Sequence, residues 1–270
     1  MKKSLVAFAC TLAVAMATLA GCASANQAPQ TQEEVAKDVV GIIGAMDIEV
    51  DSLKKEANAQ DHETIAGMEF YPGKLGDKDV IIVKCGVGKV NAGICAHTLI
   101  NHFGCDRIIN TGVAGSLDND IDIGDIVVSV DVVQHDFDAS PVGFQKGEIP
   151  YTGLYAFPAD ESLRASAVKA VEEAAPDIKV FEGRICTGDQ FITTREQKDK
   201  ITGDFGGMCC EMEGGAIAQA CYINDIPFVI IRAISDKEDG SHHVEYELFA
   251  EEAAETCSKA VQYMVENKME

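Results

Sequence analysis

Apolar and polar positions follow two different periods along this chain. Short runs rich in valine and isoleucine recur between longer segments whose apolar residues return every three or four positions. The short runs predict strands buried on both faces, and the longer segments predict helices. The predicted strands are Val39–Ala45, Val80–Cys85, Arg107–Asn110, Ile126–Val130 and Phe228–Ile234, and the predicted helices are Val50–Ala57, Lys89–Phe103, Asp160–Ala175, Arg195–Thr202, Glu213–Asn224 and Glu247–Glu266. This alternation predicts a single α/β domain with a mainly parallel or mixed central sheet flanked by helices.

A helix end and a long connection refine this prediction. The helix 89–103 is expected to stop at Gly104, because glycine readily ends a helix. The segment Gln134–Tyr155 is rich in glycine, proline and aromatic residues and is long for a connection between elements. Connections of this length usually have a function, so we expect it at a site or a subunit contact.

The first 38 residues do not share the pattern of the rest of the chain. Lys2 and Lys3 precede an apolar stretch, Leu5–Ala20, and Gly21 and Cys22 follow it directly. This is the layout of a secretory signal peptide, and cysteine after Leu-Ala-Gly resembles the bacterial lipobox, whose cysteine is acylated. An ordinary signal peptide in which Cys22 is incidental is the alternative. We expect a lipoprotein signal peptide at 1–21, a flexible tether at 22–38 and a folded domain at 39–270, in an exported protein that is lipid-anchored to the bacterial cell membrane.

Charge and cysteine content narrow the functional classes. The formal net charge of −22 becomes −24 once Lys2 and Lys3 leave with the signal. Such a chain repels nucleic-acid backbones and anionic head groups, so we expect no nucleic-acid partner and membrane contact only through the anchor. Of ten cysteines, most of those outside the signal lie in apolar strand or helix patterns, where cysteine behaves as a small hydrophobe. No pair has zinc-site spacing, and we expect no metal site.

Three acidic residues mark a candidate site. Glu49 follows the first predicted strand, Glu213 begins a predicted helix and Asp236 ends the last predicted strand. Open α/β sheets hold their ligands at the carboxyl ends of the strands, so we expect the three carboxylates to face one pocket and to perform acid–base chemistry on a small polar molecule. Each also has a structural interpretation. Glu49 and Glu213 could be solvated first-turn carboxylates, and Asp236 could cap a helix.

Other catalytic and cofactor motifs are not matched. Glycine-rich turns follow several predicted strands, as in Gly86-Val-Gly-Lys89, but none has the dinucleotide fingerprint or the phosphate-binding loop. Each glycine alone is explained by a tight turn or by a close backbone approach. No serine or cysteine stands in a strained elbow with which a histidine could form a triad, so we interpret the candidate histidines as solvated loop residues: His135, His242 and His243. We expect no cofactor.

Seven short motifs occur in a characteristic order. They are Gly41-Ile-Ile-Gly-Ala-Met-Asp-Ile-Glu49, Gly86-Val-Gly-Lys89, Ile109-Asn-Thr-Gly-Val-Ala-Gly115, Gly124-Asp-Ile-Val-Val-Ser129, Gly188-Asp-Gln-Phe-Ile192, Glu211-Met-Glu213 and Arg232-Ala-Ile-Ser-Asp236. Together they resemble the 5′-methylthioadenosine/S-adenosylhomocysteine nucleosidases of the nucleoside phosphorylase superfamily, over essentially all of residues 39–268. The resemblance implies hydrolysis of the N-glycosidic bond of these two nucleosides, and of 5′-deoxyadenosine. The products are adenine and the 5′-substituted ribose, in methionine and purine salvage.

The resemblance also implies residue roles. Glu49 would activate the attacking water, Asp236 would protonate adenine at N7 and Glu213 would hold the ribose hydroxyls. Further substrate contacts are implied for Gly115, Phe191, Ile192, Met212 and Tyr246, with Arg232 supporting Asp236. General chemistry agrees with these roles, because departure of adenine leaves positive charge on the ribose that carboxylates stabilise. Hydrolysis with inversion also needs an acid and a base on opposite faces of the sugar.

A homodimer is implied as well, because in this family the partner subunit lends a loop to the 5′ pocket. The matching residues here are Val142, Phe144 and Pro150. Val113 departs from many family members, which have a small hydroxyl residue there, and Val142 stands where an aromatic residue is usual. We expect these departures to affect the preference among 5′ substituents rather than hydrolysis itself.

Alternative functions remain at this point. A phosphate-dependent purine nucleoside phosphorylase needs cationic phosphate ligands, whereas the turn after Gly44 leads to Asp47 and Glu49. A non-catalytic nucleoside-binding lipoprotein would need no acid–base pair. Hydrolysis directed at futalosine or at nucleotides is a third possibility within the same family.

Overall fold

The chain folds around one mixed sheet. The computed structural model describes residues 38–237 and 242–269, and ten strands in these ranges form a single sheet. The strands are β1 Val39–Gly44, β2 Glu63–Ile65, β3 Met68–Leu75, β4 Lys78–Lys84, β5 Arg107–Ser116, β6 Ile126–Gln134, β7 Phe157–Pro158, β8 Val180–Thr187, β9 Cys209–Glu211 and β10 Phe228–Asp236. The helices are α1 Asp47–Glu56, α2 Lys89–Thr98, the π-helix η1 Leu99–Phe103, the 3-10 helix η2 Ser140–Val142, α3 Glu161–Ala174, α4 Arg195–Phe205, α5 Gly214–Ile223 and α6 His242–Asn267.

Parallel pairing brings several strand ends to one edge of the sheet. The strands β4, β1, β5 and β10 run parallel in this spatial order. Asn110 of β5 pairs with Ile43 of β1 and with Ile230 of β10. The strand β1 ends at Gly44, and β5 and β10 continue together beyond it until Asp236 pairs with Gly115. The strand β10 also pairs with β6, and β8 and β9 connect β6 back to β5, so that five strands close into a ring.

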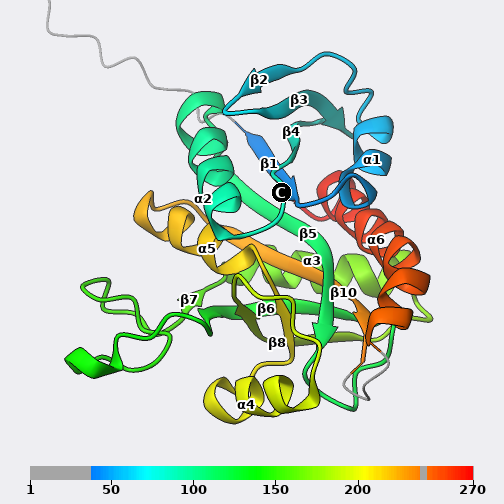
Figure 1. Cartoon of the computed structure of the whole chain (residues 1–270). Helices are drawn as coiled ribbons and strands as arrows, with labels where there is room; N and C mark the ends of the chain where they lie inside the picture. The colour runs from blue at the N-terminus through cyan, green and yellow to red at the C-terminus, as the bar shows by residue number, and fades with distance from the viewer. Residues whose placement is uncertain (1–37, 238–241, 270) are drawn as a thin grey trace, which may run out of the picture. The chain divides into compact units, whose positions relative to one another are not determined.

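The helices cover the sheet on two faces. Helices α1, α3 and α6 pack on one face, and α2 and α5 pack on the other (Figure 1). Side chains of successive strand residues point to opposite faces, so Ile42 joins the first apolar layer and Ile43 the second. Both isoleucines are fully buried. The continuous valine and isoleucine runs of the sequence therefore reflect burial on both faces.

The predicted α/β class is confirmed, and all five predicted strands are present. Several are longer than predicted, because β4 begins at Lys78, β5 continues to Ser116, β6 to Gln134 and β10 to Asp236. The extension of β5 contains Gly112 and Gly115, neither of which has a positive φ. A β-carbon on Gly112 would lie 2.0 Å from Nη1 of Arg232. These glycines therefore allow close approach of side chains to the strand instead of forming a turn.

Five strands were not predicted: β2, β3, β7, β8 and β9. The strand β8 carries charged residues instead of a continuous apolar run, and its Arg184 forms a bidentate ion pair with Asp131 of β6 at 2.6 and 2.7 Å. The hairpin of β2 and β3 turns at Ala66 and Gly67, which both have positive φ. Such two-residue turns match the twist of the paired strands.

Helix boundaries differ from the prediction in ways that matter for the candidate site. Helix α1 begins at Asp47, three residues before the predicted start, which places Glu49 in its first turn. The predicted helix 89–103 divides into α2 and the π-helix, and its stop at Gly104 is confirmed by a left-handed φ of 70°.

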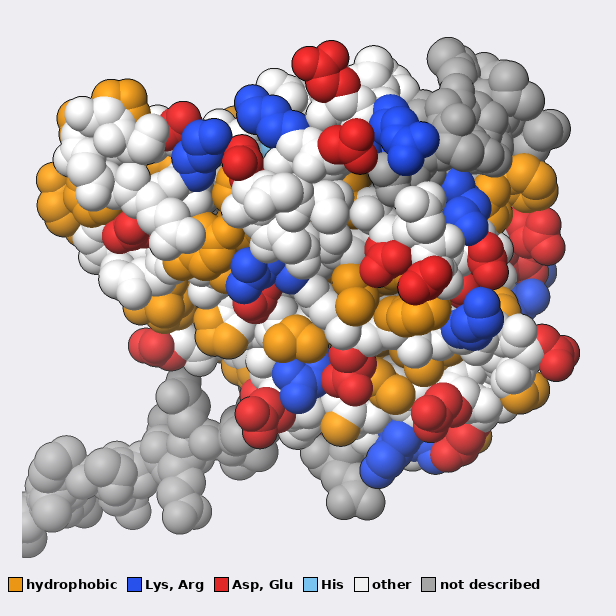
Figure 2. Space-filling view, turned by 90° about the horizontal axis from the view of Figure 1, so that it is seen from below, with side chains coloured by type: hydrophobic (Ala, Val, Ile, Leu, Met, Phe, Trp, Pro, Cys, Tyr) orange, Lys and Arg blue, Asp and Glu red, His pale blue; other side chains and the backbone are white. Residues whose placement is uncertain are grey.

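The connection after β6 reaches away from the sheet. Between β6 and β7 the chain forms only the short helix η2, and Figure 1 shows this green segment projecting to one side. On the face seen in Figure 2, lysine and arginine side chains are dispersed among acidic and hydrophobic ones. No helix in the described ranges is long and apolar enough to cross a membrane. The predicted signal peptide with Cys22 and the tether lie outside the described residues.

Candidate active site

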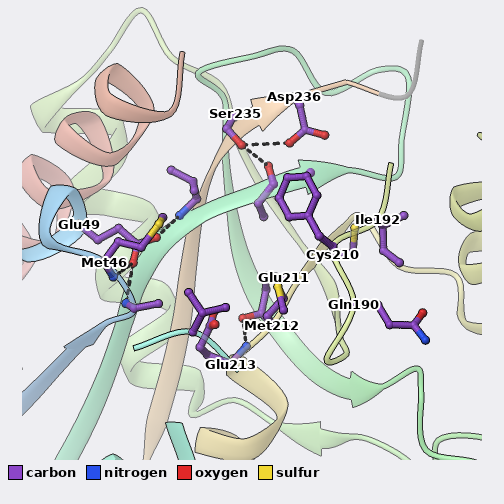
Figure 3. Close-up of a pocket in the computed structure, with 16 residues that line it drawn as sticks. Met46, Glu49, Gln190, Ile192, Cys210, Glu211, Met212, Glu213, Ser235 and Asp236 are labelled. Carbon is purple, nitrogen blue, oxygen red and sulfur yellow. Dashed lines mark hydrogen bonds between the residues drawn. The ribbon is translucent and has the colours of Figure 1, made fainter. Parts of the chain in front are cut away.

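One pocket collects the three acidic residues singled out in the sequence. It lies where β1, β5, β9 and β10 end and where α1 and α5 begin (Figure 3). Its walls are formed by Ala45, Met46, Glu49, Val87, Val113, Ala114, Gly115, Gln190, Phe191, Ile192, Cys210, Glu211, Met212, Glu213, Ser235 and Asp236. The predicted meeting of Glu49, Glu213 and Asp236 is therefore confirmed.

Glu49 is a buried carboxylate that is held by backbone donors. Its Oε2 atom accepts hydrogen bonds from the Ala45 and Met46 amides at 2.6 and 3.0 Å, and its Oε1 atom accepts one from the Val113 amide at 3.1 Å. The side chain caps the first turn of α1, but the residue is only 1% exposed, so it is not the solvated carboxylate of the structural alternative. Burial raises the pKa of Glu49 against the lowering effects of Arg232 and of the amides.

Arg232 lies fully buried on β10 beneath the pocket. Its Nη2 atom donates to Asn110 Oδ1 and to Glu211 Oε2, each at 2.5 Å, and lies 3.7 Å from Glu213 Oε2. Its Nε and Nη1 atoms have no hydrogen-bond partner among the described residues. Because the α-carbon of Gly112 carries no side chain, Nη1 and Glu49 Oε1 both approach it closely. This leaves a buried donor beside a buried acceptor.

Glu211 pairs with Arg232 and also organises the start of α5. Its Oε2 atom accepts from the amides of Glu213 and Gly214 at 3.0 and 2.7 Å. The other carboxylate oxygen accepts from the Thr187 hydroxyl, which in turn accepts from the amide of Gly215 at 2.7 Å. The first amides of α5 are thereby satisfied without the side chain of Glu213.

Glu213 is free of this capping role and reaches across the pocket. It makes no cap hydrogen bond in α5, and its Oε1 atom accepts from the Gly88 amide at 2.9 Å instead. Burial, aided by the nearby Glu211 carboxylate and opposed by Arg232, raises the pKa of Glu213 to about 7. Glu213 is thus a buried carboxyl group that changes protonation state near neutral pH.

Asp236 lies at the end of β10, on a different side of the pocket from Glu49 (Figure 3). The Ser235 hydroxyl donates to its Oδ1 atom at 3.1 Å, and the ammonium of Lys198 lies 3.2 Å from Oδ2. The expectation that Arg232 supports Asp236 is wrong, because the hydrogen bonds of the guanidinium go to Asn110 and Glu211. The cation beside Asp236 comes from α4.

The remaining wall of the pocket is largely apolar. Met46, Val87, Val113, Met212 and Ile192 supply aliphatic or thioether surface. Gly115 pairs with Asp236, and a β-carbon at Gly115 would lie 3.0 Å from Asp236 Oδ2. Phe191 borders the pocket with 53% of its surface exposed. The pocket therefore places a carboxyl group beside apolar surface, as is usual for small-molecule sites.

Other predicted residues do not line this pocket. Val142 is 75% exposed, and Phe144 stacks edge-on against Tyr151 within the projecting segment. Pro150 lies in the same segment, half-buried. Tyr246 falls in helix α6, but its side chain lies outside the described residues.

The sequence interpretation missed several groups that shape the site. Glu211 was noted as part of a motif and given no role, and Lys198 was counted only as a helix residue. Cys210, Ser235 and Met46 line the pocket without having been singled out. The signal for Glu211 was present in the Glu-Met-Glu triplet. The signal for the burial of Lys198 was its helical spacing from Ile201 and Phe205. His135, interpreted as solvated, is half-buried, and burial lowers its pKa.

Comparison with known proteins agrees with this geometry. Residues 39–266 match the phosphorylase superfamily. A 5′-methylthioadenosine/S-adenosylhomocysteine nucleosidase of Staphylococcus aureus is 42% identical over 228 residues, which are 84% of this chain and 99% of the relative. The nucleosidase structure of Colwellia psychrerythraea 34H in complex with adenine is 40% identical, with a TM-score of 0.80 and coverage of 85% of this chain and 95% of that one.

A neighbour with a different name has the same fold. Futalosine hydrolase of Helicobacter pylori is 31% identical, with a TM-score of 0.80, and the match covers 85% of this chain and 97% of that one. The superfamily match and the 42% identical relative together decide the family. The chain belongs to the phosphorylase superfamily and, within it, to the 5′-methylthioadenosine/S-adenosylhomocysteine nucleosidases.

Proposed function

We propose that the protein hydrolyses the N-glycosidic bond of 5′-methylthioadenosine and S-adenosylhomocysteine, and of 5′-deoxyadenosine, releasing adenine and the 5′-substituted ribose. The observation that carries the proposal is the presence of two buried carboxyl groups, Glu49 and Asp236, on different sides of one pocket. Hydrolysis with inversion requires a base and an acid on opposite faces of the sugar. The relatives named as nucleosidases of these substrates support the same reaction.

Glu49 acts as the general base in this proposal. Its raised pKa makes the carboxylate a better proton acceptor than an exposed glutamate. The attacking water is bound by Glu49, which lines the pocket. Val113 contributes an amide to Glu49 but no side-chain hydroxyl to the water.

Asp236 acts as the general acid and Glu213 as the ribose ligand. Asp236 donates its proton to N7 of adenine as the bond between C1′ and N9 breaks, so that the base departs neutral. Glu213 accepts hydrogen bonds from the ribose hydroxyls when it is ionised. The carboxylates of Glu49, Glu211 and Glu213 outnumber the one guanidinium beside them, and this arrangement stabilises the positive charge that develops on the ribosyl ring.

Hydrolysis fits the pocket better than phosphorolysis. A phosphorylase binds an inorganic phosphate beside the sugar, and phosphate recognition relies on cationic side chains or clusters of free amides. Among the described residues that line the pocket there is no lysine or arginine. The amides next to Glu49 are already bonded to its carboxylate. Futalosine is the second candidate substrate, because the futalosine hydrolase neighbour has the same fold.

We further propose that the protein is a homodimer whose projecting segment completes the 5′ pocket of the partner subunit. Large apolar side chains are exposed on α2, on α5 and in that segment: Val90, Ile94, Ile223, Val142 and Tyr151. These elements lie on the same side of the sheet in Figure 1. Contiguous exposed apolar surface usually marks an interaction site. Phe144 and Pro150 would face the 5′ substituent of the substrate in the neighbour.

We also propose export and lipid anchoring. The cationic start, the apolar stretch and the Leu-Ala-Gly sequence before Cys22 support cleavage after residue 21 and acylation of the cysteine. Several acyl chains on one residue give stable anchoring, whereas one chain binds only marginally. Residues 22–38 then tether the nucleosidase domain, 39–270, to the membrane.

The first test removes the proposed acid and base. Glu49→Gln and Asp236→Asn should each lower the rate of adenine release by at least ~10²-fold, because each replaces a positioned proton-transfer group. Glu56→Gln, an exposed change on the same helix as Glu49, is the control and should keep full activity. The measurement is adenine release from methylthioadenosine, S-adenosylhomocysteine, 5′-deoxyadenosine and futalosine, with and without inorganic phosphate. A requirement for phosphate, binding without turnover, or near-full activity of either variant would contradict the proposal.

The second test concerns Glu213 and the ribose. Glu213→Gln should cost roughly 2–4 kcal/mol in transition-state binding for ribonucleosides, and less for a 2′-deoxy substrate that lacks one of the hydroxyls. The same substitution should increase the relative stability of the folded protein at neutral pH. Because the folded pKa is raised to about 7, the unmutated protein loses stability relative to Glu213→Gln as the pH rises from about 4.5 to 7. Equal losses on both substrates, or a pH-independent stability difference in denaturant titrations, would speak against the assignment.

The third test measures assembly. Sedimentation should find a dimer for the unmutated chain, and Val90→Asp should shift it toward monomer because it places a charge in the proposed apolar contact. Activity should fall with dissociation, since the 5′ pocket then lacks its second wall. Lys169→Asp, an exposed change on α3, is the control and should remain dimeric. A fully active monomer would contradict the shared pocket.

The fourth test examines the N-terminus. Mass spectrometry of the membrane fraction should find a mature chain that begins at Cys22 and carries lipid. Cys22→Ser should leave soluble active enzyme or uncleaved precursor, because serine cannot form the thioether to the lipid. An unmodified chain that begins at Met1 in the cytoplasm would rule out both the export and the anchor.

A further inference from the structure

A buried lysine stands beside the proposed acid. Lys198, in α4, has no exposed surface, and its ammonium lies 3.2 Å from Asp236 Oδ2 and 3.0 Å from the Lys237 carbonyl oxygen. Burying a charged ammonium is costly unless it is paired. A lysine kept at such a position therefore has a specific partner, and here the partner is Asp236.

The position of Lys198 in α4 is a core position. Ile201 and Phe205 follow it at helical spacing, and both are buried in a small apolar cluster. An aliphatic side chain at residue 198 would pack in this cluster without the free-energy cost of desolvating a charge. Helix α4 begins only three residues after Ile192, which lines the pocket. One short segment thus supplies both the wall expected to contact adenine and the cation next to the acid.

Other charged or titratable groups near Asp236 are occupied or neutral. The Lys237 ammonium is directed to Asp122, at 2.6 Å, and to the Asn119 carbonyl oxygen. The Cys210 thiol on β9 stays protonated, because burial raises its pKa to about 12. On β10 the neutral Ser235 hydroxyl bonds to Oδ1, and the paired residue on β5 is Gly115. Among the described residues, Lys198 is the charge in direct contact with the Asp236 carboxyl group.

We propose that Lys198 is a positioning residue that fixes the Asp236 carboxyl group and stabilises the carboxylate that remains after proton transfer. This proposal rests on the proposed function, in which Asp236 protonates adenine at N7. When the proton moves from Asp236 to N7, the electron pair of the C1′–N9 bond passes to the base and Asp236 is left as a carboxylate. The Lys198 ammonium stabilises that carboxylate more than the neutral acid, so it favours the transfer.

The experiment compares neutral variants of the full chain. Lys198→Met retains the length of the side chain, and Lys198→Gln also retains a donor for the Lys237 carbonyl. Both should lower kcat on the nucleosides by about tenfold or more. Lys200→Met removes an exposed charge from the same helix and should leave kcat unchanged. A second substrate, the p-nitrophenyl riboside of 5-methylthioribose, has a leaving group that departs without a proton, so the kcat loss should largely disappear on it.

The outcomes separate the inference from the proposed function. If the unmutated protein releases no adenine from any of the nucleosides, the proposed function fails before Lys198 is tested. If it releases adenine but both neutral variants keep the kcat of the unmutated protein on the nucleosides, the inference is wrong. Equal kcat losses on the nucleoside and on the aryl riboside would likewise assign Lys198 a purely structural role.

Discussion

The structure of the site depends on one fully buried guanidinium. Arg232 lies in the middle of the sheet, where the free energy of transferring an unpaired charge from water is highly unfavourable. Glu211 and Asn110 compensate for it from two neighbouring strands, each at 2.5 Å. Removing one partner of a buried ion pair typically costs about 3–5 kcal/mol, because the other charge is left uncompensated. The strands β5, β9 and β10 are therefore held together by an interaction that tolerates little change.

The same guanidinium determines the properties of its neighbours. Three glutamates surround it and one cation cannot neutralise them all, so burial raises the pKa values of Glu49 and Glu213. The guanidinium occupies the space that a side chain at residue 112 would need, so only glycine fits there. Glu211, which pairs most closely with Arg232, also receives the first amides of α5 and leaves Glu213 free to face the pocket. The same carboxylate thus balances the charge of Arg232 and caps helix α5.

The fold alone does not choose the substrate. Nucleosidases and a futalosine hydrolase share this architecture at equal TM-scores of 0.80, so selectivity must reside in the pocket walls. Val113 lines the pocket, whereas Val142 and Phe144 lie on a segment that reaches away from it. In the proposed dimer that segment would complete the pocket of the partner subunit, and the preference among 5′ substituents would depend on it.

The sequence by itself determined the α/β class, the five apolar strands and the three carboxyl groups of the pocket, because buried parallel strands read as continuous apolar runs and their ends converge at one edge. Only the tertiary structure decided how the charges pair. It assigned Arg232 to Glu211 instead of Asp236, and it buried Lys198 against Asp236. These pairs join residues 21 and 38 positions apart. The helical spacing of Lys198 from Ile201 and Phe205 places it on the buried face of α4, but no local period encodes which distant carboxylate the ammonium meets.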